Sequence, residues 1–276
     1  MTLQNKIDFA LVFKVKNANP NGDPLGGNRP RTTSDGLGEV SDVCLKRKIR
    51  NRLQEMGCEI FVQADGNNQD GKKSLSERFN DFLKSLTRDE QKDKQTVASK
   101  VCEKWIDVRS FGQVFAFKKG TDSDEVSLGV RGPVTIQSAF SIEPITIESI
   151  QITKSVNSET TEKGGKSSDT MGMKHRVSEA IYVTYGSISP QLAEKTGFTA
   201  SDADIIKDAI VSLFEGDESS ARPGGSMYVK NVVWFSHSSK AGQYSSAKVH
   251  QSVDVDKEGT VKIAPLEGLT PEIIDA

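Results

Sequence analysis

Residues Asn17 to Leu53 hold a long stretch that is unsuited to regular structure and, directly after it, a basic helix. Its first part, NANPNGDPLGGNRPRTTSDGLGEV, is too rich in Gly, Pro and Asn for helix or strand and predicts a long loop. The second part, SDVCLKRKIRNRL, predicts a helix that begins near Ser41 and ends at Gly57. Five of the seven residues from Lys46 to Arg52 are Lys or Arg. Free backbone N–H groups beside a cationic helix suit a phosphate-rich ligand.

The distribution of charge supports that interpretation. The chain has a net charge of -2, which argues weakly against nonspecific binding of nucleic acid. From Arg29 to Arg52, however, there are seven basic and three acidic residues, so this segment is +4 and the remainder is -6. A run of charge is more often a solvated helix face. Because the adjoining loop adds N–H donors and the fork of Arg31, an anionic ligand is favoured here, with the acidic remainder facing protein.

Length and composition place the chain among ordinary soluble proteins. Its 276 residues suffice for one large domain with insertions or two small ones. No apolar run is long enough to span a membrane, and Asp8 and Lys14 interrupt any signal-peptide core. Three scattered cysteines and three scattered histidines show no metal-ligand spacing. We therefore expect a cytoplasmic protein without metal, cofactor or membrane partner.

The order of expected elements predicts an α+β fold. Alternation from Ile7 to Val15 predicts a half-buried strand, and capping pairs at Ser74 and Thr87 open two helices within an insertion at about 58–104. Residues 105–117, 131–145, 178–190 and 227–235 predict strands, and Ser201 with Asp204 predicts the start of a further helix. Residues 154–170 hold almost nothing apolar and predict an extended projection. Without the insertions, the order is that of a ferredoxin-like, RRM-like domain.

Signals for catalysis are few. The sequence has no G-x-S-x-G, and GGKSS at 164–168 lacks the first glycine of a phosphate-binding loop, since Thr160 stands there. Asp23, in the basic loop, is the one credible catalytic candidate, although an Asp before Pro more often caps its own turn. Met171 and Met173 follow the projection, where methionine either fills a core or wedges between bases.

Several motifs together resemble a known family. They are NANPNGDP, GNRPR and SDVCLKRKIRN in the first fifth of the chain, then Asp107-Val108-Arg109 with Phe111-Gly112, Arg131-Gly132-Pro133-Val134, Thr170-Met171-Gly172 with Lys174-His175, and Ser220-Ala221-Arg222. Spread from residue 7 to about 237, this pattern resembles the backbone subunit of type I CRISPR surveillance complexes (Cascade). That subunit belongs to the Cas-seven (Cas7) family of the RAMP superfamily, and this sequence most resembles the type I-C branch of the family.

The resemblance implies a fold and a function. It implies a single domain over 1–276, an RRM-like palm with a helical insertion at about 58–104 and a thumb hairpin at 150–176. Such subunits are non-catalytic, stack head to tail along CRISPR RNA as a helical filament, and leave bases free to pair with a target DNA strand. The implied partners are CRISPR RNA, the paired DNA strand, further copies of the chain and other Cascade subunits. The implied RNA-binding residues are Asn19, Asn21, Gly22, Asn28, Arg29, Arg31, Ser41, Lys46, Arg47, Arg50, Arg109, Arg131, Met171, Lys174, His175, Arg176 and Arg222.

Two other functions remain open from the sequence. The first is an RNA endonuclease, as in type III relatives that use a loop aspartate, for which Asp23 is the candidate. The second is an RRM-like RNA binder that acts alone as a monomer.

Overall fold

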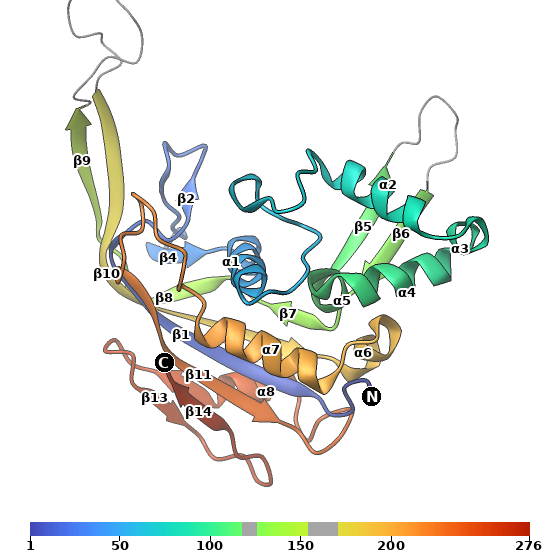
Figure 1. The fold of residues 1–276 in the computed structure, drawn as a ribbon. Coiled ribbons are helices and arrows are strands. Elements are labelled where there is room, and N and C mark those ends of the chain that lie inside the picture. The colour runs from blue at the N-terminus through green and yellow to red at the C-terminus, as the bar shows by residue number, and fades with distance from the viewer. Residues whose placement is uncertain (118–125, 154–170) are drawn as a thin grey trace, which may run out of the picture.

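A large antiparallel sheet forms the centre of the computed structural model, which describes residues 1–117, 126–153 and 171–276. The strands lie in the order β14–β11–β1–β10–β8–β4, and β7 and β9 also pair with β10 (Figure 1). Their bounds are β1 Ile7–Ala18, β4 Leu37–Val40, β7 Val134–Ile136, β8 Ala139–Pro144, β9 Ile147–Thr153, β10 Met171–Ile188, β11 Met227–Ser236 and β14 Glu272–Asp275. The α+β class expected from the sequence is confirmed.

Strand β1 is buried on both faces, so the expectation of a half-buried strand was wrong. Phe9, Leu11 and Phe13 pack under helices α1 (Asp42–Glu55), α6 (Pro190–Thr196) and α7 (Ala200–Val211). Ala10 and Val12 pack in a second cluster with α8 (Ser246–Gln251), β12 (Val253–Val255) and β13 (Val261–Ile263). The carboxyl-terminal segment thus covers part of the sheet face that an RRM leaves open to RNA.

Helix α1 forms where the sequence predicts it. The Ser41 hydroxyl accepts a hydrogen bond from the Cys44 N–H, which satisfies a free donor of the first turn. The helix ends before Gly57, whose φ of +86° suits glycine. Leu45, Ile49 and Leu53 are fully buried against the sheet, and the cation Lys48 is also buried, at 4% exposure.

The helical insertion has a core of its own. It contains α2 (Leu75–Ser85), α3 (Arg88–Lys92), α4 (Lys94–Lys104) and α5 (Ile106–Phe111), with strands β5 (Gly112–Phe117) and β6 (Val126–Arg131) and a short 3-10 turn at Asp65–Asn67. Phe61, Phe79, Phe82, Trp105 and Phe115 pack together there. This cluster extends past residue 104 into β5 and β6, which pack on the helices.

Three local expectations were wrong. Residues 106–111 form α5 rather than a strand, because tertiary contacts on two sides outweigh the β-propensity of a short apolar run: Ile106 enters the main core and Val108 the insertion core. The loop after β1 contains strands β2 (Gly22–Asp23), β3 (Arg29–Pro30) and β4. Helix α7 is capped by Thr199 and Asp202, whose side chains each accept the other's backbone N–H, and not by Ser201 and Asp204.

The expected thumb at 150–176 falls largely outside the described residues, and we use the name thumb root for the ladder between β9 and the first third of β10. Residues 154–170 lie outside the described part of the chain. On either side of them, β9 and the first third of β10 form an antiparallel ladder in which Met173 faces Gln151 and His175 faces Ser149. Within the described residues, none of the helices has the length and apolar character needed to cross a membrane.

Candidate nucleic-acid interface

The β2–β3 hairpin is held by Asp23. Its backbone carbonyl accepts the N–H groups of Asn28 at 2.7 Å and Gly26 at 3.1 Å, and its Oδ1 accepts the N–H of Leu25 at 3.2 Å. The same carboxylate lies 3.6 Å from Nη2 of Arg31. Asp23 therefore caps its own turn and pairs with a neighbouring cation, which is the structural role that the Asp-Pro sequence favours.

Hydrogen bonds from polar side chains brace the base of this hairpin. The buried Asn19 donates from Nδ2 to the Asn28 carbonyl at 2.7 Å, and Asn21 Oδ1 accepts from both the N–H and the hydroxyl of Ser41 at 3.0 Å. Asn19 and Asn21 thus link the loop to itself and to the start of α1. These contacts leave Asn28, which is exposed at a φ of +58°, on the outer side of the hairpin.

Gly22 lies in close contact with that brace, and its replacement gives a test. A Cβ at Gly22 would lie 1.9 Å from Asn28 Oδ1 and 3.2 Å from Asn19 Nδ2. We expect Gly22→Ala to displace Asn28 and weaken RNA binding about tenfold, with the thermal unfolding midpoint shifted by at most a few degrees. Gly66→Ala is the matched control, because nothing lies within 4 Å of its Cβ position. Equal RNA affinity for both variants, measured by fluorescence anisotropy, would contradict this role of Gly22.

The hairpin is tied to the root of the thumb. Arg29 donates from Nη1 to Ser149 Oγ at 3.1 Å, and Ser149 Oγ lies 2.9 Å from His175 Nδ1. Strand β3 packs beside β10 at this point. Arg176 is less available, because it pairs with Glu148 at 2.8 Å, whereas Lys174 is half-buried with no ion pair among the described residues.

Two cations of α1, Arg47 and Arg50, bind the insertion. Arg50 Nε donates to Asp107 Oδ2 at 3.1 Å, and Arg47 Nη1 donates to the Val62 carbonyl at 2.6 Å. Burial lowers the pKa of Arg47, although a guanidinium stays charged at neutral pH. Lys46 pairs with Asp42 one turn away at 3.0 Å and keeps part of its surface exposed. Arg47 and Arg50 therefore connect α1 to the insertion, and Lys46 is left partly exposed on the helix surface.

Two other predicted cations also have internal partners. Arg109 binds Asp202 with two nitrogens, at 2.7 and 3.1 Å. Burial alone would raise the pKa of the Asp202 carboxyl, but hydrogen bonds from Arg109 and Thr199 outweigh it and hold the pKa below its usual value. Arg222 pairs with Asp217 at 2.8 Å, and Asp217 also pairs with the buried Lys48. Arg131, in contrast, is exposed in β6 with no acidic partner among the described residues.

The remaining histidines are structural. His237 is fully buried and donates from Nε2 to Asp8 at 2.8 Å, while its Nδ1 accepts the Gln243 N–H at 2.9 Å. His250 lies 3.1 Å from the Gly186 carbonyl. Both therefore hold the carboxyl-terminal segment against the sheet.

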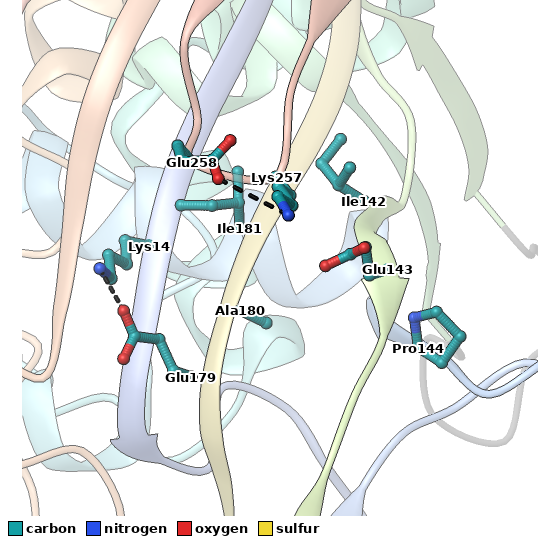
Figure 2. Close-up of a pocket in the computed structure, with 9 residues that line it drawn as sticks. All are labelled: Lys14, Ile142, Glu143, Pro144, Glu179, Ala180, Ile181, Lys257 and Glu258. Atoms are coloured by element: carbon teal, nitrogen blue, oxygen red, sulfur yellow. Dashed lines mark ion pairs between the residues drawn. The ribbon is translucent and has the colours of Figure 1, made fainter.

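A hollow of about 350 Å³ lies beside the second core cluster, between β8, β10 and the turn after β12 (Figure 2). Its two lysines, Lys14 and Lys257, each pair with a glutamate, Glu179 and Glu258. Glu143 adds a further negative charge to the lining. The hollow therefore offers little to a phosphate, and the hairpin and thumb root remain the candidate interface.

Two features of this interface were missed at the sequence level. Asp107 is buried and anchors Arg50, and Leu25 stands 99% exposed at the hairpin tip. The Asp107 partner lies 57 residues from Arg50, so no local pattern indicates the pair. Leu25 follows a Pro in a turn sequence, and this position in DPLGG is the only signal for its exposure.

Comparison with known proteins gives the family. A family model described as CRISPR-associated protein Cas7 matches residues 5–269. A CRISPR-associated protein Cas7 from Haloferax volcanii is 35% identical over 127 residues, which are 45% of this chain and 36% of that protein. The match thus spans little more than a third of this relative's length.

Two solved structures that this chain matches are described as CRISPR RNA-guided surveillance complexes. One, in a pre-nicking state, has a TM-score of 0.47 at 16% identity and covers 83% of this chain and 78% of that one. Another has a TM-score of 0.46 at 17% identity and covers 83% and 68%. Since the family match alone extends over nearly the whole sequence, the chain belongs to the CRISPR-associated protein Cas7 family.

Proposed function

We propose that this chain is a non-catalytic subunit that binds CRISPR RNA and lines up head to tail along it, forming the backbone of a Cascade-type complex. One observation carries the proposal: the β2–β3 hairpin and the thumb root are joined by the Arg29–Ser149–His175 chain. The N–H groups of Leu25, Gly26 and Asn28 are bonded to Asp23, so the donors offered here are the guanidinium groups of Arg29 and Arg31, and cations of this kind hold phosphates.

The fold supports this function. The strand order β11–β1–β10–β8, with α1 after the first strand and α7 before the last, is that of a ferredoxin-like domain. We therefore retain a single domain over 1–276 with an RRM-like palm, a helical insertion at about 58–104 and a thumb at 150–176. The similarity to the type I-C branch stays a prediction.

The internal ion pairs divide the proposed RNA-binding residues into two groups. Direct contact with the sugar–phosphate strand is assigned to exposed or half-exposed groups, namely Gly22, Asn28, Arg29, Arg31, Lys46, Arg131, Met171, Lys174 and His175. A supporting role is assigned to residues whose side chains are bound to other parts of the fold or brace the loop, namely Asn19, Asn21, Ser41, Arg47, Arg50, Arg109, Arg176 and Arg222. Arg29 and His175 share the Ser149 hydroxyl, and Arg31 and Lys46 pair with a carboxylate of their own loop or helix, so these four stay in the first group.

The proposed partners follow if the protein holds the RNA by its sugar–phosphate backbone. Bases left free pair with a target DNA strand, and the protein reads shape and charge rather than sequence. Further copies and other Cascade subunits complete the assembly, which we place in the cytoplasm. The endonuclease alternative is less supported, because the Asp23 carboxylate is engaged by the Leu25 N–H and Arg31.

Sizing on RNA tests the proposal. The purified chain, of 30.1 kDa, is mixed with single-stranded RNAs of increasing length and measured by mass photometry. We expect masses that rise in steps of one subunit as the RNA lengthens. A single copy per RNA at every length would favour the monomeric RNA binder. Cleavage of the RNA that needs a divalent metal and is lost in Asp23→Ala would favour the endonuclease.

A further inference from the structure

The second face of the sheet is covered at β10 but open at β8. Val183 on β10 is buried in the cluster formed with the carboxyl-terminal segment, whereas Phe140, directly opposite it on β8, is 41% exposed. Glu39 on β4 lies opposite Phe140 on its other side. Residues that face one another across strands project from the same face, with Cβ atoms about 5 Å apart. An aromatic ring and a carboxylate therefore lie side by side on the open part of this face.

The hollow in Figure 2 continues this surface along β8. Ile142 lies two residues after Phe140 and shares its face, and it lines the hollow together with Ile181 of β10. Figure 2 shows the Glu143 side chain directed from β8 toward β10. At about 350 Å³, the hollow has room for one long side chain of another molecule. We call Glu39, Phe140, Ile142, Ile181 and Glu143 the β8 strip.

The β8 strip carries negative charge without a counter-charge. Two further glutamates at the hollow, Glu179 and Glu258, each pair with a lysine. The carboxylates of Glu39 and Glu143, in contrast, take part in no ion pair or hydrogen bond within residues 1–117, 126–153 and 171–276. Uncompensated carboxylates repel the phosphates of RNA or DNA and attract cations. The occupant that this surface selects is therefore cationic.

An arginine side chain matches each end of the strip. At one end, a guanidinium stacks on an aromatic ring and binds a carboxylate, the pair that Phe140 and Glu39 provide. At the other end, the aliphatic part of a long side chain lies on Ile142 and Ile181 while its charged head meets Glu143. The two ends are three residues apart on β8, about 10 Å. Two arginines separated by one residue in an extended segment, with Cα atoms about 7 Å apart, span this distance with their side chains.

We propose that the β8 strip is a docking site for a short extended segment of a partner protein that carries two arginines separated by one residue. A folded interface of ordinary stability needs about 800 Å² from each partner, far more than five side chains provide, which favours a linear segment. The inference goes beyond RNA binding, because it assigns a second, acidic surface of the same chain to a protein.

A second copy of this chain fits the strip less well. Its own Arg29-Pro30-Arg31 has the required spacing. Arg29, however, donates to Ser149, and Nη2 of Arg31 lies 3.6 Å from Asp23 Oδ1. Both arginines would have to leave these partners, and the RNA proposed above, to enter the strip of another copy. We therefore assign the strip to a different protein.

A labelled peptide with two arginines flanking one serine tests the proposal on the full chain, with binding followed by fluorescence anisotropy and located by amide NMR shifts. We expect the peptide to move the signals of residues 139–144 and to bind more weakly as salt rises. Phe140→Leu keeps an apolar side chain but removes the ring, so it should bind about fivefold more weakly, the effect of one exposed cation–π contact. Glu143→Gln should lose a similar factor through its charge.

Glu218→Gln is the matched control, because Glu218 is exposed as Glu143 is but lies in the loop between α7 and β11. It should bind the peptide as the original chain does. The proposal is wrong if the peptide does not bind, if a peptide with aspartates in place of the arginines binds equally well, or if all variants bind alike. A dimer of the chain that Glu143→Gln dissociates would identify a second copy as the occupant instead. Phe140→Leu and Glu143→Gln should keep the RNA affinity of the original chain, so this proposal and the proposed function fail independently.

Discussion

Asp107→Ala is expected to lower the free energy of unfolding by about 3–5 kcal/mol, the range for breaking a buried ion pair. Asp107 is fully buried. Its Oδ1 accepts the Phe61 N–H at 2.8 Å, and its Oδ2 accepts the Val62 N–H at 3.0 Å and Arg50 Nε at 3.1 Å. The substitution leaves two backbone donors and one cation without an acceptor, and each loss adds to the cost.

Urea denaturation followed by circular dichroism measures this loss, and hydrogen exchange locates it. Exchange should rise first at residues 58–63, where the chain enters the insertion. Asp89→Ala is the control, because its side chain is 95% exposed on α3 and its removal should cost little. A decrease in unfolding free energy of less than about 1 kcal/mol for Asp107→Ala would show that the insertion does not depend on the contacts of Asp107.

The same geometry affects how substitutions in α1 are interpreted. Arg50 is only 13% exposed and stacks on Phe111 at 5.1 Å while it pairs with Asp107. Arg50→Ala therefore leaves an unpaired buried carboxylate, and RNA binding would fall through disordering of the insertion as well as through lost charge. A substitution in the β2–β3 hairpin or at Lys174 separates these effects more cleanly.

Local sequence was sufficient for features that depend on neighbouring residues. The cap at Ser41, the stop at Gly57 and the turn at Asp23 each use side chains and backbone within a few positions. The presence of strand β1 likewise follows from its own residues, although its burial on both faces does not. Because β1 and α1 flank the loop, predicting these two elements was enough to place the loop between them.

Features that depend on distant partners escaped prediction. Arg109 meets Asp202 across 93 residues and Lys48 meets Asp217 across 169. A basic helix looks the same in sequence whether its cations face phosphate or buried carboxylates. The second face of the sheet is covered by residues after 245, and no periodicity in β1 could indicate that cover. The interface thus lies next to the predicted helix and draws its free cations from the loop and thumb root.

Combined removal of Arg29, Arg31 and Lys174 is expected to have the largest effect on RNA binding. These cations lie on the hairpin and the thumb root, and Arg29 is exposed while the other two are partly so. If each contacts one phosphate, the triple alanine variant should bind about 100-fold more weakly at low salt, at roughly 1 kcal/mol per exposed contact. The slope of log affinity against log salt should flatten by about 2, at roughly 0.7 per contact with a single strand.

Two comparisons separate charge from architecture. The triple variant Lys84→Ala, Lys92→Ala and Lys100→Ala removes the same charge from exposed positions on the insertion, so it should leave the slope nearly unchanged. Ser149→Ala breaks the Arg29 link and keeps all three cations. If Ser149→Ala alone reproduced most of the loss, Arg29 would act by anchoring the thumb root rather than by holding phosphate. If the alanine variant of Arg29, Arg31 and Lys174 kept the salt slope of the original chain on guide sequences of different composition, the sugar–phosphate contacts would lie elsewhere on the chain.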